Sequence, residues 1–209
     1  MPAAVQRHRR YTEEEYHEID RNAPDGVRYE FWDGIIWPVN GYEPDGITAM
    51  AGAEPEHNQL KDNICRELGN RLTRRGCRVL SSDQKVTTGE VGRYFYPDVV
   101  VACRPEYDDS RPRILLNPEL IVEVSSESTA EVDRGEKLVR YMSLPTVQEV
   151  WLADPGRPLV LQYLRPHEGE EEWRLRAYLG LDAAVRSEAF EVEAPLRDLY
   201  VLLLDDEQT

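Results

Sequence analysis

The sequence predicts an α/β fold in which a mixed central β-sheet is flanked by helices, with an extra β-hairpin towards each end of the chain. Residues 99–103 and 120–125 are short, largely apolar runs, which is typical of buried strands. A helical segment, residues 130–143, separates the second run from another apolar strand, residues 147–153. Because a crossover helix joins parallel strands, whereas directly successive strands tend to pair antiparallel, these elements predict a sheet of mixed direction.

The N-terminal part of the chain predicts a short helix and then a hairpin. Thr12 precedes three glutamates, so its hydroxyl can cap a helix whose first turn is acidic, and this helix should end before Pro24. Residues 27–32 and 35–39 are predicted as two strands, because an Asp-Gly pair between them is typical of a tight turn. Residues 40–54, which are rich in glycine, proline and aspartate, predict a loop.

A long helix is predicted next, over residues 55–75. Proline suits its first turn, apolar side chains recur along it every four residues, and Gly76 ends it. The apolar stripe consists of Leu60, Ile64, Leu68 and Leu72. The further predicted strands are residues 77–86, 94–103, 120–125, 147–153, 159–164 and 173–178. Since there are no internal repeats or linkers, the 209 residues predict a single domain.

Composition predicts a cytoplasmic protein. The longest apolar runs are far too short to span a bilayer, and the first ten residues lack the apolar stretch of a secretory signal. The three cysteines, Cys65, Cys77 and Cys103, are an odd number without CxxC spacing. They are therefore expected to be reduced thiols, and neither zinc ligands nor a disulfide framework.

Two carboxylates lie inside otherwise apolar strands, Asp98 within residues 96–101 and Glu123 within residues 120–125. A buried carboxylate is disfavoured unless its charge is compensated, so two of them on consecutive strands suggest a shared cation. Side chains alternate along a strand, which places Glu123 and Ser125 on one face and allows Asp98 to join them. Such oxygen ligands suit Mg²⁺ or Mn²⁺. The alternative is that each carboxylate pairs with an arginine.

Lys137 is the cation whose position suits these two acids best. It lies on the helix that follows the Glu123 strand, and Arg134, Lys137 and Arg140 or Tyr141 share one helix face. A lysine beside the acids could orient a water molecule or stabilise charge on a phosphate. The alternative is an ordinary surface lysine.

Several short motifs, in this order and spacing, resemble the Uma-type restriction endonuclease family, a bacterial family of the PD-(D/E)XK nuclease superfamily. The resemblance covers about residues 12–154. The motifs are Tyr29-Glu30-Phe31-Trp32-Asp33-Gly34, Pro55-Glu56-His57, Tyr96-Pro97-Asp98, Glu123-Val124-Ser125, Asp133 with Lys137 and Tyr141, and Val150-Trp151-Leu152-Ala153-Asp154.

The resemblance implies a restriction-endonuclease-like core, about residues 55–154, of a helix, three strands, a helix and a strand. It also implies a divalent metal at Asp98 and Glu123, and hydrolysis of DNA phosphodiester bonds. The usual lysine of the superfamily, two residues after the second acid, is replaced here by Ser125. The resemblance therefore nominates Lys137 for the role of the lysine, with Lys85 as the second choice.

Two further residues match family motifs, and each of them has two possible interpretations. Glu30 either adds a third carboxylate to the metal site or pairs with an arginine across strands. His57, at the start of the long helix, either is a structural histidine or lies at the edge of the cleft. Together with Ser125 and Lys85, His57 is an accessory candidate.

The function predicted from these residues is that of a Mg²⁺- or Mn²⁺-dependent endonuclease. Asp98 and Glu123 would bind the metal, Lys137 and Glu30 would complete the catalytic set, and Arg134 and Arg140 would contact DNA despite the net charge of −15. A homodimer is predicted because cutting both DNA strands usually takes two sites. The alternatives are a catalytically silent relative that binds nucleic acid or a protein, and a structural protein of a mobile element or toxin system.

Overall fold

The structure is a computed structural model, which describes residues 9–39, 54–87, 92–110, 112–124, 130–168 and 171–203. The side chains of residues 130–134 and 136 lie outside this description. The chain divides into two compact units, Met1–Gly52 with Gly89–Tyr96, and Ala53–Thr88 with Pro97–Thr209. The single domain expected from the sequence stays a prediction. Within the described segments, no helix has both the length and the hydrophobicity that a membrane span requires.

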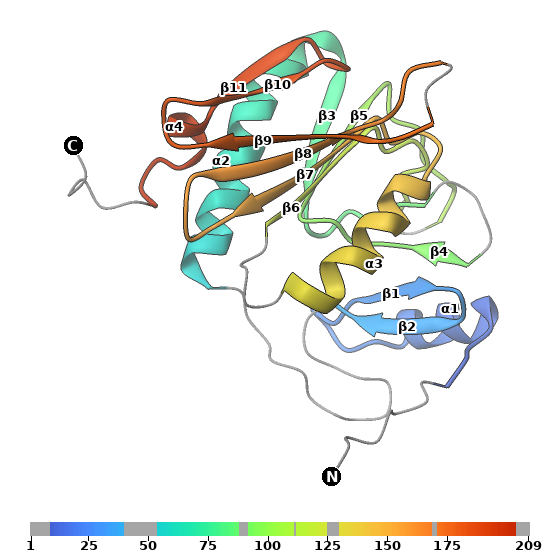
Figure 1. Cartoon of the computed structure of the whole chain (residues 1–209). Coiled ribbons are helices and arrows are strands. Elements are labelled where there is room, and N and C mark those ends of the chain that lie inside the picture. The colour runs from blue at the N-terminus through green and yellow to red at the C-terminus, as the bar shows by residue number, and fades with distance from the viewer. Residues whose placement is uncertain are drawn as a thin grey trace. The chain divides into compact units, whose positions relative to one another are not determined.

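The first unit packs one helix against a small sheet. Its helix α1 (Glu13–Arg21) begins with a capping box between Thr12 and Glu15, as the sequence predicts. Its strands β1 (Tyr29–Trp32), β2 (Ile35–Pro38) and β4 (Arg93–Tyr94) pair in the order β2-β1-β4 (Figure 1). The predicted hairpin is therefore confirmed, and the core of this unit consists of Tyr16, Tyr29, Phe31 and Ile36.

The second unit is built on a six-stranded sheet with the order β3-β5-β6-β7-β8-β9. The pair β6–β7 is parallel and the other pairs are antiparallel, so the predicted mixed sheet is confirmed. The strands are β3 (Cys77–Ser81), β5 (Val99–Cys103), β6 (Leu120–Val124), β7 (Glu149–Asp154), β8 (Leu159–Leu164) and β9 (Arg174–Leu179).

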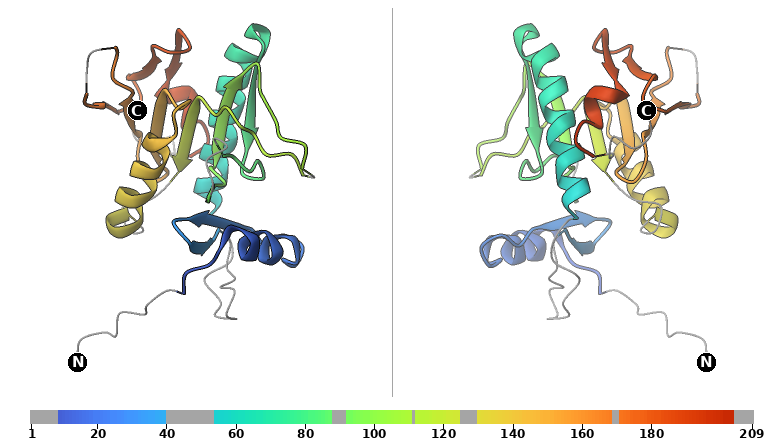
Figure 2. Two further views of the ribbon diagram at one scale, coloured as in Figure 1. Left: turned by 90° about the vertical axis from the view of Figure 1, so that its right-hand side faces the viewer. Right: turned by 90° about the vertical axis from the view of Figure 1, so that its left-hand side faces the viewer.

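Two helices cover opposite faces of this sheet (Figures 1 and 2). Helix α2 (Pro55–Leu72) continues into a 3-10 turn, η1 (Thr73–Arg75), and ends at Gly76, which adopts a positive φ of 82°. Its leucines pack on the face that carries Val122 and Val124. Helix α3 (Ala130–Ser143) is the crossover between β6 and β7, and its Tyr141 contacts Glu123, whose side chain points to the other face.

Two predicted strands are shorter than expected. The segment predicted as residues 94–103 is divided, because β4 pairs with β1 in the first unit whereas β5 pairs with β3 and β6 in the second. Pro97 lies at the division and has no backbone N–H to donate to a sheet. The segment predicted as residues 77–86 ends as a strand at Ser81, where a turn begins.

The C-terminal part forms a layer that the sequence did not predict. Strands β10 (Ala184–Ser187) and β11 (Val192–Pro195) make a hairpin, and a short helix, α4 (Leu196–Leu199), follows. This layer packs on the same face of the sheet as α2, and the Asn63 side chain of α2 donates hydrogen bonds to the carbonyls of Leu199 and Val201. The region beyond β9 therefore completes the core of the second unit.

The expectation that all three cysteines are reduced is wrong for two of them. Cys77 on β3 stands directly opposite Cys103 on β5, and the two form a disulfide. Their pairing depends on the register of two strands that are 26 residues apart in sequence, which cysteine spacing does not reveal. Cys65 is a free thiol, and burial raises its pKa to about 11.

Reduction of this disulfide should lower the free energy of unfolding by about 3 kcal/mol, because a crosslink limits the conformations of the unfolded chain. Denaturant unfolding with and without reductant measures the difference. The Cys65→Ser variant is the control, since it should show the same response to reductant. Equal stability of the reduced and oxidised wild-type protein would contradict the prediction.

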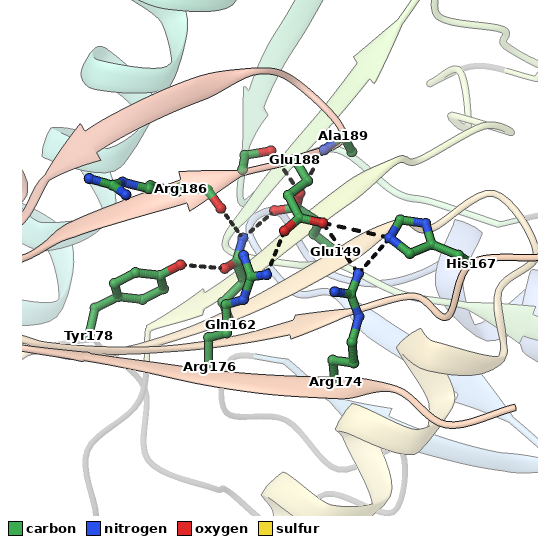
Figure 3. Close-up of polar contacts among 10 residues, drawn as sticks. Glu149, Gln162, His167, Arg174, Arg176, Tyr178, Arg186, Glu188 and Ala189 are labelled. Carbon is green, nitrogen blue, oxygen red and sulfur yellow. Dashed lines mark hydrogen bonds and ion pairs between the residues drawn. The ribbon is translucent and has the colours of Figure 1, made fainter. Parts of the chain in front are cut away.

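A buried carboxylate ties β7 to the C-terminal layer (Figure 3). Glu149 is only 1% exposed, and its oxygens accept hydrogen bonds from the Trp151 indole, the Gln162 amide, the Ser187 hydroxyl and the Ala189 backbone N–H. Tyr178 of β9 donates to the carbonyl oxygen of the same glutamine. Within the described part of the chain, these hydrogen bonds satisfy the carboxylate without a basic partner, so we assign the network a structural role.

Candidate functional site

The pairing of β5 with β6 brings two predicted acids to adjacent positions. Val99, the first residue of β5, stands opposite Val122, so Asp98 lies immediately before β5 and close to Glu123 on the neighbouring strand. The backbone N–H of Val124 also donates to Asp98 Oδ2 at 2.9 Å. The two acids therefore lie near each other at this end of β5 and β6, and the shared metal site stays a prediction.

Asp98 is held by a histidine from the helix on the other face. His57 lies in the first turn of α2, and its Nε2 is 3.1 Å from Asp98 Oδ2. The other ring nitrogen, Nδ1, is buried and has no hydrogen-bond partner among the described residues. The hydrogen bond to Asp98 raises the pKa of His57 against the opposing effect of burial.

The charge state of Asp98 results from opposing effects. Burial by itself raises the pKa of this carboxyl group, whose side chain is 17% exposed. The hydrogen bond and charge of His57, the Val124 N–H and the charge of Lys137 outweigh burial and bring the pKa below its usual value. Asp98 is therefore held as a carboxylate, the form that binds a metal ion.

Glu123 is held by two side chains of α3. Lys137 Nζ lies 3.0 Å from Glu123 Oε1, and the hydroxyl of Tyr141 donates to the same oxygen at 2.5 Å. Lys137 and Tyr141 are four residues apart, so they lie on one face of the helix. The ammonium group also lies 5.7 Å from the centre of the Tyr141 ring. The lysine predicted for this site is thus bonded to one of the two predicted acids.

The donor set suits a hard cation that keeps much of its water. Among the described residues, no group of three or more His, Cys, Asp or Glu side chains is arranged to hold a metal ion. Mg²⁺, however, is commonly bound by only one or two carboxylates and retains several waters. Asp98 and Glu123 provide two partly buried carboxylates of this kind, with side chains 17% and 13% exposed. They fit Mg²⁺ or Mn²⁺ better than a metal that needs a closed protein cage.

The other predicted residues lie in different places. Glu30 belongs to the first unit, where its carboxylate accepts a hydrogen bond from the backbone N–H of Tyr96 at 2.9 Å. Lys85 is buried in the segment after β3. Arg140 is only 8% exposed, so it has little surface to offer to DNA. Ser125 and the side chain of Arg134 lie outside the described residues.

Tyr141 contacts Glu123 but was not among the site residues predicted from the sequence. A partial signal was present in the sequence, because Tyr141 lies one helical turn beyond Lys137 and belongs to a family-like motif. Its bond to Glu123 depends on how α3 packs against β6, which periodicity along a helix does not specify.

Comparisons with known proteins agree with this architecture. Residues 13–197 match the family Uma2, described as "Putative restriction endonuclease". An uncharacterized protein of Synechocystis sp. is 34% identical over 140 residues, covering 66% of this chain and 78% of the relative. A second uncharacterized Synechocystis protein is 28% identical over 155 residues, covering 74% of each.

A solved structure shares the fold. It is a protein of Anabaena variabilis ATCC 29413, described as a putative nuclease belonging to DUF820, with a TM-score of 0.67 and 17% sequence identity. The match covers 92% of this chain and 99% of that one. The restriction-endonuclease-like α/β fold expected from the sequence is thereby confirmed. Because the family match spans most of the sequence, the chain belongs to the Uma2 family.

Proposed function

We propose that this protein is a metal-dependent endodeoxyribonuclease that hydrolyses phosphodiester bonds of DNA. The observation that carries the proposal is that Asp98 accepts a hydrogen bond from the Val124 N–H, next to Glu123, and that Lys137 forms an ion pair with Glu123. Two carboxylates and a lysine at one end of a buried sheet combine metal ligands with a group that can stabilise a charged phosphate. Membership of a family described as restriction endonucleases supports the same reaction class.

Each residue has a distinct task in the proposed reaction. Asp98, kept ionised by His57 and the Val124 N–H, provides one metal ligand, and Glu123 provides the other. A divalent ion bound there would lower the pKa of a water molecule and reduce the charge repulsion between the acids and a phosphate. The ammonium group of Lys137 would stabilise the negative charge that develops on the phosphate oxygens.

DNA would reach this site by a limited set of contacts. The chain carries a net charge of −15, so its average surface repels a phosphate backbone. We therefore place the phosphate contact on Lys137, which is partly exposed, ahead of the buried Arg140. Few phosphate contacts imply modest affinity and a shallow dependence on salt for a DNA-binding protein. Glu30 stays a candidate for the catalytic set, Arg134 a candidate DNA contact, and Ser125 and Lys85 accessory candidates.

The proposal includes a homodimer in the cytoplasm. Breaking both strands of a duplex calls for two copies of such a site, and sedimentation equilibrium would measure the assembly. The Cys77–Cys103 disulfide argues against this location, because a reducing cytoplasm would keep both cysteines as thiols. Trapping their state by alkylation in intact cells tests it. A disulfide trapped in that assay would argue for an oxidising compartment.

Cleavage of supercoiled plasmid DNA tests the reaction. Wild-type protein should nick the plasmid with Mg²⁺ or Mn²⁺, and a chelator should stop it. Lys137→Ala should lower the rate by about 10²–10³-fold, the usual loss when one charge-stabilising donor is removed. Arg186→Ala is the control, because Arg186 is an exposed cation on β10 whose side chain pairs with Glu193 at the surface.

Two outcomes would count against the proposal in different ways. Nicking that survives chelation would rule out the metal mechanism. A protein that binds Mn²⁺ but cleaves no DNA would favour the catalytically silent alternative, a nuclease-fold protein that binds nucleic acid or another protein. If Lys137→Ala were fully active while Lys85→Ala were not, the lysine role would move to Lys85.

A further inference from the structure

We propose that Tyr141 is a positioning residue of the metal site, which sets the orientation of the Glu123 carboxylate and of the Lys137 ammonium together. The inference rests on the proposed function, because it assigns to Tyr141 a role in the geometry of that site. Tyr141 touches neither the metal nor the phosphate in this scheme. It acts through Glu123, the side chain that its hydroxyl contacts.

Three contacts support this role. The Tyr141 hydroxyl donates to Glu123 Oε1 at 2.5 Å, and the Lys137 ammonium lies 3.0 Å from that same oxygen. The ammonium also lies 5.7 Å from the centre of the Tyr141 ring. The tyrosine therefore contacts both partners of the ion pair, one through its hydroxyl and the other through its ring.

Burial gives the tyrosine the rigidity that such a role needs. Tyr141 is completely buried, whereas the side chains of Glu123 and Lys137 retain some exposure. The terminal torsion of a glutamate is broad, so a free carboxylate samples many orientations about its last bond. A fixed hydroxyl and an ammonium that both contact Oε1 restrict this rotation. The carboxylate plane is then set before a metal ion arrives, which reduces the cost of binding.

The arrangement has a chemical consequence for the metal. Groups that hydrogen-bond to a metal-binding carboxylate commonly change metal affinity about 10–100-fold when they are removed. Tyr141→Phe keeps the ring and removes only the hydroxyl. We expect this variant to bind Mn²⁺ about tenfold more weakly than the wild type. It should also cleave DNA more slowly at a metal concentration that saturates the wild type.

A matched control separates positioning from general stability. Tyr178 is a partly buried tyrosine of the same unit, and its hydroxyl donates to the side-chain oxygen of Gln162. Tyr178→Phe therefore also removes a hydrogen-bonded hydroxyl, but on β9, which β7 and β8 separate from the strand that carries Glu123. It should leave the Mn²⁺ affinity unchanged. Titrating free Mn²⁺ by electron paramagnetic resonance measures the affinity of each variant without any need for activity.

A double-mutant cycle tests whether Tyr141 acts through Glu123. In a Glu123→Gln background, where Mn²⁺ binding depends mainly on Asp98, Tyr141→Phe should cause no further loss of affinity. An equal loss in both backgrounds would overturn the proposal, because the tyrosine would then act on the fold as a whole. Unchanged affinity of Tyr141→Phe in the wild-type background would also overturn it, as would loss of its folded circular dichroism spectrum.

The failure of this inference can be told apart from failure of the proposed function. If wild-type protein bound no Mn²⁺, or bound it equally well after Asp98→Asn, the metal site itself would be wrong. If the wild type bound Mn²⁺ through Asp98 and cleaved DNA, while Tyr141→Phe matched it in both respects, only the role of Tyr141 would be wrong.

Discussion

Asp98→Asn should abolish the metal-dependent cleavage of DNA, with a loss of rate of about 10³-fold or more. The substitution removes one of the two proposed carboxylate ligands but keeps an oxygen that can accept the His57 and Val124 hydrogen bonds. A metal ion contributes several kcal/mol of transition-state stabilisation, and each factor of ten corresponds to about 1.4 kcal/mol. Single-turnover nicking of a plasmid measures the rate, and Mn²⁺ titration measures the loss of the ligand.

The control is another aspartate, Asp182, which lies in the exposed turn between β9 and β10. The side chain of Asp182 is 99% exposed and pairs with Arg197 on the surface. Asp182→Asn should therefore leave both rate and metal affinity as they are in the wild type. A fully active Asp98→Asn protein, shown to be free of contaminating nuclease by its inhibition with chelator, would contradict the proposed site.

Glu149→Ala should lower the free energy of unfolding by about 4 kcal/mol, the largest stability effect that we expect from one side chain in the second unit. The substitution leaves three buried donors without this acceptor, namely the Trp151 indole, the Gln162 amide and the Ser187 hydroxyl. It also removes the hydrogen bond from the backbone N–H of the exposed Ala189, which Figure 3 shows beside Glu149 and Gln162. An unsatisfied buried donor costs about 1–3 kcal/mol, and partial rearrangement reduces the sum. Denaturant unfolding followed by circular dichroism measures the change.

A second glutamate in the same region is the matched control. Glu188 bonds to Arg174 and Arg176, but its side chain is 40% exposed, so water and salt weaken these ion pairs (Figure 3). Glu188→Ala should cost less than about 1 kcal/mol. Similar losses for the two variants would show that the hydrogen bonds of Glu149 do not carry the stability that we assign to them.

Much of the local structure could be predicted because its causes are local. The Thr12 capping box, the Asp-Gly hairpin turn and the end of α2 at Gly76 all depend on residues within a few positions of one another. The bounds of α3, residues 130–143, match the prediction, and so does the mixed direction of the sheet. A crossover helix between two apolar strands allows few other arrangements.

Features that depend on strand register could not be predicted in the same way. The division of residues 94–103 follows from the pairing of β4 with β1 in one unit and of β5 with β3 in the other. The Cys77–Cys103 disulfide follows from the register of β3 and β5. The hairpin β10–β11 is short and carries charged residues between its apolar ones, so its sequence pattern is too weak to predict two strands. Packing of its apolar side chains against α2 stabilises it.

The candidate site shows the same division. The sequence by itself determined which residues are chemically unusual. Asp98 and Glu123 are acidic residues within apolar runs, and burying a carboxylate in such a strand costs free energy. The tertiary structure alone decided their partners. It brought His57 from one helix to Asp98, and Lys137 and Tyr141 from another to Glu123. Residue type fixes the cost of burying a charge, whereas the compensating contacts come from segments distant in the chain, whose approach depends on the packing of the whole unit.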